Sequence, residues 1–219
     1  MSGFIVHGVP GSPYGRAVLA ALIEKGQSFT FKALAPGGAK QPDHLAKMPF
    51  GRIPLFEHGS FVLYETQAIL RYLERIIPEP PLSPADPRAA ARMDQLIGIN
   101  DWYLFGEVGR VIAFQRIIAP KLLGAEPDEA VVAAAMPRAE ICYAELDRLL
   151  GDQPYLTGDA LTLADLMIAP HLDLLAATPE GEALLQARPR LAAWLARVLA
   201  RPSFTATTWE AVAALAQAA

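Results

Sequence analysis

Residues 4–18 read FIVHGVPGSPYGRAV, and the fold of the first part of the chain follows from them. Residues 4–9 form a short apolar run that is typical of a buried strand. A turn containing proline and glycine comes next. Ser12 then stands where a helix begins, because serine is a favoured N-cap and proline suits the first helical position. The helix is expected over 14–25 and ends at Gly26. The segment therefore predicts a strand, a tight turn and a capped helix.

Further strands and a helix are expected before residue 78. Residues 28–34 alternate aromatic and polar side chains, as a second strand does. Residues 55–57 and 60–64 flank His58-Gly59, a two-residue loop suited to an antiparallel hairpin. Residues 66–77 place their apolar side chains on one helical face. The order is strand–helix–strand, a short irregular or helical piece, then strand–strand–helix. It predicts a parallel pair with a right-handed crossover, to which the hairpin adds antiparallel strands.

The ten residues 78–87 contain five prolines, which exclude a helix and favour a stiff, extended linker. We place this linker at 80–87, between a first domain over 1–79 and a second over 88–219. Only helices are expected downstream. Their ranges are 88–119 as one helix or two, 126–151 interrupted near Pro137, 162–176 with Pro170 inside it, 190–200 and 203–216.

The composition excludes several classes of function. Hydrophobic residues make up 53% of the 219, which is enough for a sizeable core. The formal net charge is −4 and no basic stripe is present, which argues against nucleic acid as a partner. The N-terminus lacks the features of a signal peptide, and no apolar run is long enough for a membrane span. Cys142 is the only cysteine, as suits a reducing cytoplasm, and the four scattered histidines predict no metal site.

Ser12 has two interpretations. It is either a plain N-cap or a hydroxyl placed where the helix N-terminus offers free N–H groups and positive partial charge. A thiol ionises more easily at such a point, and a serine hydroxyl there donates a hydrogen bond to a thiolate of a bound molecule. Tyr14, two residues later, is the alternative donor.

Two further segments have the same double interpretation. Pro54 begins a predicted strand and requires Ile53 to be extended. The pair is either a loop that enters an edge strand or a cis-proline turn that directs the Ile53 backbone towards a peptide-like ligand.

Glu65 and Thr66 stand where a strand passes into a helix. Thr66 is either an N-cap, or its hydroxyl and the helix N–H groups bind a carboxylate while Glu65 binds an ammonium group. The second alternative suits the zwitterionic end of an amino acid.

In this order and spacing, the three segments resemble the cytosolic glutathione transferases of the serine type, bacterial-like and with phi- and theta-like features. Ile53 replaces the family's valine before the cis proline, and Thr66 replaces its serine after the acidic residue. The resemblance continues over 156–165, 188–194 and 200–204, and so covers essentially the whole chain. It implies an α/β thioredoxin-like N-terminal domain followed by an all-α C-terminal domain.

The stretch 161–166 also carries a folding signal of its own. Thr162 and Asp165 have the spacing of a capping box, in which each side chain accepts a hydrogen bond from the other residue's backbone N–H. Leu161 and Leu166 supply the hydrophobic staple. We expect Asp165 to stabilise the fold and to take no part in catalysis.

The resemblance implies roles for individual residues. Ser12 hydrogen-bonds the sulfur of glutathione as the catalytic group. The backbone of Ile53, which precedes Pro54, pairs with the cysteinyl part of glutathione, and the Glu65–Thr66 pair holds the γ-glutamyl end. Lys40 is either the basic residue for the glycyl carboxylate or a solvated lysine. The apolar pocket for the second substrate is expected to include three aromatic side chains, those of Tyr14, Phe105 and Phe114.

The function that the resemblance implies is a cytoplasmic glutathione transferase active in detoxification. It conjugates reduced glutathione, its co-substrate, to a small hydrophobic electrophile, and it is a homodimer that binds neither nucleic acid nor membrane. The same fold also supports a glutathione-dependent peroxidase, disulfide reductase, isomerase or dehalogenase. A non-catalytic glutathione-transferase-like binding module is the remaining alternative, and the intact Ser12, Glu65 and Thr66 argue against it.

Overall fold

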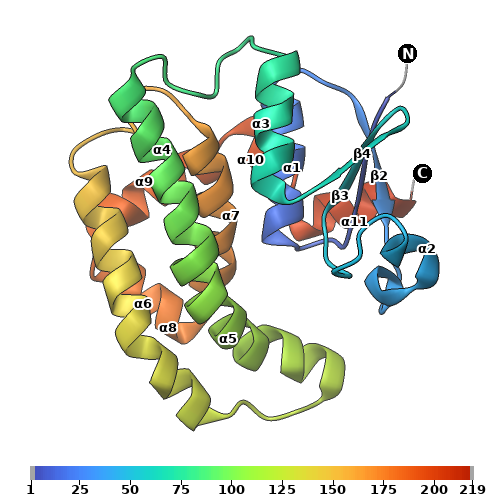
Figure 1. Ribbon diagram of the computed structural model, residues 1–219. Helices are drawn as coiled ribbons and strands as arrows, with labels where there is room; N and C mark the ends of the chain where they lie inside the picture. The colour runs from blue at the N-terminus through green and yellow to red at the C-terminus, as the bar shows by residue number, and fades with distance from the viewer. Residues whose placement is uncertain (1–2, 218–219) are drawn as a thin grey trace. The chain divides into compact units, whose positions relative to one another are not determined.

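The computed structural model describes residues 3–217 and divides the chain into two compact units (Figure 1). The first unit comprises Met1–Leu82 together with Leu199–Ala219, and the second comprises Ser83–Val198. The change from one unit to the other after Leu82 falls within the expected linker. The last segment of the chain differs from expectation, because it packs with the first unit and not with the helices that precede it in sequence.

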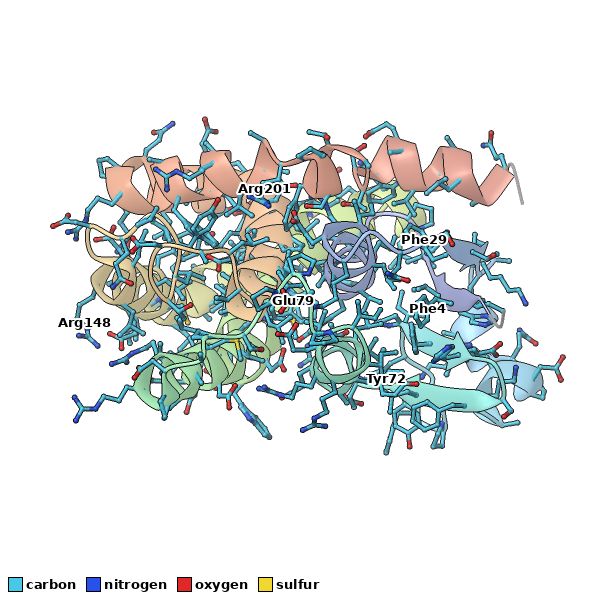
Figure 2. The ribbon with its side chains drawn as sticks, turned by 90° about the horizontal axis from the view of Figure 1, so that it is seen from above. Phe4, Phe29, Tyr72, Glu79, Arg148 and Arg201 are labelled. Atoms are coloured by element: carbon cyan, nitrogen blue, oxygen red, sulfur yellow. The ribbon has the colours of Figure 1, made fainter. Side chains whose placement is uncertain are left out.

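The first unit is built on a four-stranded sheet with the order β2-β1-β3-β4. β1 (Phe4–Gly8) pairs in parallel with β2 (Phe29–Ala33), so that Phe4 lies opposite Phe29 (Figure 2). β3 (Leu55–His58) runs antiparallel to β1, and β4 (Phe61–Tyr64) runs antiparallel to β3. The predicted pairing is confirmed. The hairpin loop is shifted by one residue, since His58 pairs with Phe61 and leaves Gly59-Ser60 as the loop, with Gly59 at φ 62°.

Two helices pack against this sheet, α1 (Pro13–Glu24) on β1 and α3 (Thr66–Ile76) on β4. The two helices lie alongside each other (Figure 1). Val6, Phe31 and Phe56 occupy one register position on neighbouring strands and are all buried, which marks the core side of the sheet. Between β2 and β3 the chain forms the short helical pieces η1 (Gly38–Lys40) and α2 (Pro42–Leu45). The first unit thus has the predicted thioredoxin-like arrangement.

The end of the chain forms two helices where one was expected over 203–216. They are α10 (Pro202–Thr205) and α11 (Trp209–Gln217). Glu24 at the end of α1 accepts hydrogen bonds from Arg201 at 2.7 and 2.8 Å and from Ser203 at 2.6 Å; Arg201 is labelled in Figure 2. These bonds attach α10 to α1, and α11 packs against β2, the edge strand of the sheet. The charge-assisted hydrogen bonds between α1 and the start of α10, together with the packing of α11 against β2, explain why this segment belongs to the first unit.

The named elements of the second unit are all helices, and an isolated antiparallel bridge pairs Tyr155 with Gly158 in one of its loops. A continuous helical run covers α4 (Pro87–Ile99), η2 (Asn100–Gly109), α5 (Arg110–Ala113) and η3 (Phe114–Leu123). Its η2 and η3 segments consist of wider π-helical turns. The other helices are α6 (Glu129–Leu150), α7 (Leu163–Ala176), α8 (Pro179–Gln186) and α9 (Pro189–Leu199).

Helix α8 was not among the predicted helices. Its signal was present, because Thr178 caps the helix by accepting from the N–H of Gly181 at 3.2 Å and Pro179 occupies the first helical position. The predicted capping box of α7 is confirmed: Thr162 and Asp165 form the reciprocal pair. None of the helices in residues 3–217 combines the length and the apolar character that crossing a membrane requires.

Candidate active site

Ser12 is the N-cap of α1. Its Oγ accepts a hydrogen bond from the backbone N–H of Gly15 at 3.2 Å, and its own N–H donates to the carbonyl of Val9 at 3.2 Å. Both predicted roles are compatible with this geometry, because a hydroxyl oxygen that accepts from the backbone keeps its hydrogen for an acceptor elsewhere. Among the described residues no acceptor for that hydrogen is found. The side chain is only partly buried, so a ligand can reach it.

The segment before β3 contains a cis peptide bond between Ile53 and Pro54, as the second interpretation of that pair predicted. Pro54 is buried and directly precedes Leu55, the first residue of β3. The strand that it precedes lies between β1 and β4, so it is an interior strand and not the edge strand considered for the first interpretation. His44 bonds the carbonyl of Arg52 through Nε2 at 2.8 Å and thereby holds the preceding turn.

Glu65 is the N-cap of α3 and has φ 68° and ψ 110°. It is the one residue other than glycine with positive φ among those the structure describes. Such a conformation costs on the order of 1–3 kcal/mol and persists where the surroundings impose it, commonly at binding sites. Its side chain makes no capping hydrogen bond and is exposed. Thr66 is buried and is the first helical residue of α3, so the interpretation of Thr66 as the N-cap is wrong.

Lys40 lies across the backbone of the loop before Pro54. Its Nζ donates to the carbonyl of Phe50 at 3.3 Å. A Cβ added to Gly51, which has φ +58°, would lie 2.7 Å from the Lys40 Nζ and 2.8 Å from its Cδ. The lysine stem therefore packs on the glycine backbone, three residues before Pro54. This placement favours a positioned lysine over a freely solvated one.

The register of the sheet brings these positions to one end of the sheet. His7 pairs with Leu55, and Leu55 pairs with Tyr64 on its other side. The turn that leads to Ser12, the cis Pro54 and Glu65 each lie within a few residues of this row, at the same edge. Three segments, of which the first and the last are 53 residues apart (Ser12 to Glu65), thus provide a hydroxyl donor, the backbone beside a cis proline and an exposed carboxylate, next to two helix N-termini.

Comparison with known proteins decides the family. The family model of the glutathione S-transferase N-terminal domain matches residues 6–81, and that of the glutathione S-transferase C-terminal domain matches residues 129–197. Glutathione S-transferase F7 of Arabidopsis thaliana is 32% identical over 207 residues, which are 93% of this chain and 98% of that protein. The chain belongs to the glutathione S-transferase family. It is a transferase enzyme, and glutathione is its co-substrate.

Solved structures of this family agree with the fold described above. Glutathione transferase F7 from Populus trichocarpa has a TM-score of 0.84 at 28% identity, with 97% of this chain and 99% of that chain covered. Glutathione S-transferase I from maize, solved in complex with an atrazine glutathione conjugate, has a TM-score of 0.82 at 28% identity and 98% coverage of both chains. The finer assignment to a serine-type, bacterial-like enzyme stays a prediction.

The predicted pocket residues of this glutathione transferase are divided between the two units. Tyr14 is half-buried in the first turn of α1, whereas Phe105 and Phe114 belong to the second unit. The Phe105 ring packs edge-on against His171, with 4.8 Å between ring centroids, and Phe114 is 40% exposed. Cys142 is buried in α6, and burial raises the pKa of its thiol to about 11. That cysteine is thus protonated and inaccessible, which removes it as a nucleophile.

One contact next to Ser12 was not anticipated. The ring of Trp209, at the start of α11, lies directly over Gly11. Local sequence signals could not have found it, because nearly 200 residues separate the two positions.

Proposed function

We propose that this glutathione transferase conjugates the thiol of reduced glutathione to small apolar electrophiles, with the Ser12 hydroxyl stabilising the thiolate. The observation that carries the proposal is the Ser12 geometry at the N-terminus of α1. Its Oγ accepts from Gly15, which leaves the hydroxyl hydrogen to point at a bound sulfur. A free thiol has a pKa of about 8.5, and each unit by which the pKa is lowered requires about 1.4 kcal/mol of preferential stabilisation of the anion.

Glutathione is proposed to bind at the end of the sheet where His7, Leu55 and Tyr64 lie side by side. Its γ-glutamyl ammonium group pairs with Glu65, and its carboxylate with Thr66 and the N-terminus of α3. The Ile53 backbone beside Pro54 pairs with the cysteinyl residue, and Lys40 neutralises the glycyl carboxylate. The charges are complementary in sign. Because cysteine is the central residue of the tripeptide, holding both of its ends in this way would leave its sulfur to Ser12.

The chemical step is a displacement or addition at an electrophilic carbon. The thiolate forms a new carbon–sulfur bond, and a leaving group departs with the bonding electrons or the electrons move onto the acceptor. We propose that Tyr14, Phe105 and Phe114 contribute an apolar surface for the electrophile. The maize relative bound to an atrazine glutathione conjugate supports a substrate of this kind, and hence a role in detoxification.

Two assays test the proposal together. We expect retention of the protein on immobilised glutathione and release by free glutathione, and we expect turnover of a chlorodinitrobenzene with glutathione. Retention without turnover of the aromatic halide would favour the peroxidase, disulfide reductase or isomerase alternatives, to be separated with a peroxide, a glutathione disulfide and an isomerisable substrate. Failure of both retention and turnover would leave the non-catalytic module.

We also propose that the protein is a cytoplasmic homodimer. Phe50 is 62% exposed and its ring lies edge-on to Tyr64, with 6.1 Å between centroids. An exposed phenylalanine supported by a second aromatic ring is typical of an anchor at a protein–protein interface. A second copy of the chain is the partner that such an anchor would serve in an isologous dimer.

A further inference from the structure

Trp209 covers the turn that carries Ser12. Gly11 has φ +82°, and a Cβ built on it would lie 2.2, 2.5 and 2.7 Å from three ring atoms of Trp209. Only a residue without a side chain can occupy this position, both because of its left-handed backbone and because the indole ring fills the space above it. The ring therefore rests directly on the Gly11 backbone, one residue before Ser12.

The position of Trp209 is fixed by elements of the same unit. It is the first residue of α11, which packs against the edge strand β2. The preceding helix is attached to α1 through Glu24, Arg201 and Ser203. Since β2 and β1 are parallel, with Ala33 opposite Gly8, the end of β2 and the turn after β1 lie at the same edge of the sheet. The indole is thus held at the end of the sheet where His7, Leu55 and Tyr64 lie, to which glutathione binding is assigned.

Trp209 also keeps much of its surface available. It is 49% exposed, although one face lies on Gly11. Val9, in the same turn, is 38% exposed. Consecutive Cα atoms are about 3.8 Å apart, so the residue that the ring covers is the direct neighbour of Ser12 in the chain. Under the proposed function an electrophile must approach the sulfur that Ser12 holds, and the exposed part of the Trp209 ring lies on the turn that leads to Ser12.

We infer that Trp209 forms a stacking subsite for the second substrate, and that this subsite selects electrophiles with a planar aromatic or heteroaromatic ring. The inference rests on the proposed function and adds a class of substrate to it. Planar rings prefer offset stacking or edge-on contact with an indole, whereas aliphatic electrophiles gain little from its π-face. The first unit thereby supplies a part of the second-substrate site from the C-terminal segment of the chain.

Kinetics with two electrophiles tests the subsite. Trp209→Leu keeps an apolar cover over Gly11 but removes the ring, and Trp209→Phe keeps a smaller ring. For a chlorodinitrobenzene we expect KM to rise about three- to tenfold in Trp209→Leu and less in Trp209→Phe. For an alkyl iodide, and for glutathione itself, KM should stay unchanged in both variants. Phe61→Leu, which removes an exposed ring of the first unit from the opposite end of the sheet, serves as the matched control.

Fluorescence provides a second, direct measurement. The dinitrophenyl conjugate of glutathione quenches a nearby indole, and the chain has three tryptophans. We expect binding of the conjugate to quench the wild type and Trp102→Phe alike, and to lose most of this quenching in Trp209→Phe. Equal quenching in Trp209→Phe and the wild type, or an equal rise of KM for both electrophiles in Trp209→Leu, would overturn the inference. Failure of the wild type to bind the conjugate would instead contradict the proposed function.

Discussion

At the scale of single residues, Ser12 uses one hydroxyl for two purposes. Its oxygen caps α1 through Gly15, and its hydrogen is free for the thiolate. We predict that Ser12→Ala lowers turnover at neutral pH about ten- to hundredfold, because a hydrogen bond to a charged group contributes about 1.5–3 kcal/mol. Glutathione affinity should change little. The measurement is the pH–rate profile, whose rise should move to higher pH as the thiol pKa increases.

The result of that experiment also separates Ser12 from Tyr14. If Tyr14 or backbone N–H groups activate the thiol, Ser12→Ala loses helix-cap stability of about 0.5–2 kcal/mol while its pH–rate profile stays in place. Ser12→Cys is the matched gain-of-function variant. It should introduce disulfide-exchange activity, since it places a thiol at a helix N-terminus, at the expense of conjugation.

Glu65 has an unfavourable backbone and an exposed carboxylate, a combination that folding alone does not require. We predict that Glu65→Ala abolishes measurable glutathione binding in titration calorimetry, because the ammonium group loses its counter-charge. Glu65→Gly should lose binding as well and yet unfold at a higher temperature than Glu65→Ala, since glycine accepts positive φ without strain. Retained binding in a folded Glu65→Ala protein would remove this residue from the site.

At the scale of elements, Asp165 organises the start of α7. It is buried and accepts four hydrogen bonds at 2.8–2.9 Å, from the N–H groups of Leu156 and Thr162, the Thr162 hydroxyl and the indole of Trp194. Burial raises the pKa of this carboxyl, and the hydrogen bonds oppose that shift. The residue thus connects the loop before α7, the helix start and α9.

We predict that Asp165→Ala lowers the free energy of unfolding by at least about 3 kcal/mol, because several buried donors lose their acceptor together. Denaturant unfolding measures this loss. Asp165→Asn, which keeps one oxygen acceptor, should lose less, and the remaining folded protein should still bind glutathione. A drop in glutathione affinity at full stability would contradict a purely structural role.

We predict that His171, which is buried in α7, makes the free energy of unfolding of the protein depend on pH. Burial lowers its pKa to about 4, against 6.5 for the free side chain, although a hydrogen bond between Nδ1 and the carbonyl of Met167 at 2.7 Å favours the charged form. As the pH falls from about 6.5 to about 4, the unfolded chain takes up a proton that the folded chain does not. Stability should therefore fall across that window, by up to about 3 kcal/mol.

The measurement for His171 is the free energy of unfolding as a function of pH in the wild type and in His171→Gln. The glutamine keeps a donor for Met167 and does not titrate, so the difference between the two curves isolates the histidine. The difference should be constant above pH 7 and should change in favour of the variant below about pH 6. Parallel curves down to pH 4 would show that His171 is not buried in solution.

At the scale of the whole molecule, the assembly is the main prediction. We expect light scattering at micromolar concentration to give twice the chain mass of 23.6 kDa. Phe50→Glu, which places a charge on the exposed aromatic anchor, should shift the population towards the monomer, whereas Phe61→Glu on the same unit should leave it dimeric. A monomer in the wild type would contradict the homodimer.

The amino-acid sequence determined whatever depends on a few neighbouring residues. The strand–helix–strand and strand–strand–helix order, the Ser12 cap and the capping box around Asp165 follow from periodicity and from side chains that bond a backbone group within four residues. Local sequence also marks α8, because Thr178 is a favourable N-cap and Pro179 suits the first helical position, although this helix was not predicted. The shifted hairpin loop at Gly59 is different, because only strand register selects it.

The tertiary structure alone decided which remote segments meet. Register placed Ser12, Pro54 and Glu65 at one edge of the sheet, and packing placed Lys40 on Gly51. It also assigned the C-terminal segment to the first unit and set Trp209 on Gly11. Contacts of this kind are selected by which apolar surfaces can be buried together after the chain has closed long loops. No local propensity encodes that choice, so the stacking subsite proposed here becomes visible only in the folded molecule.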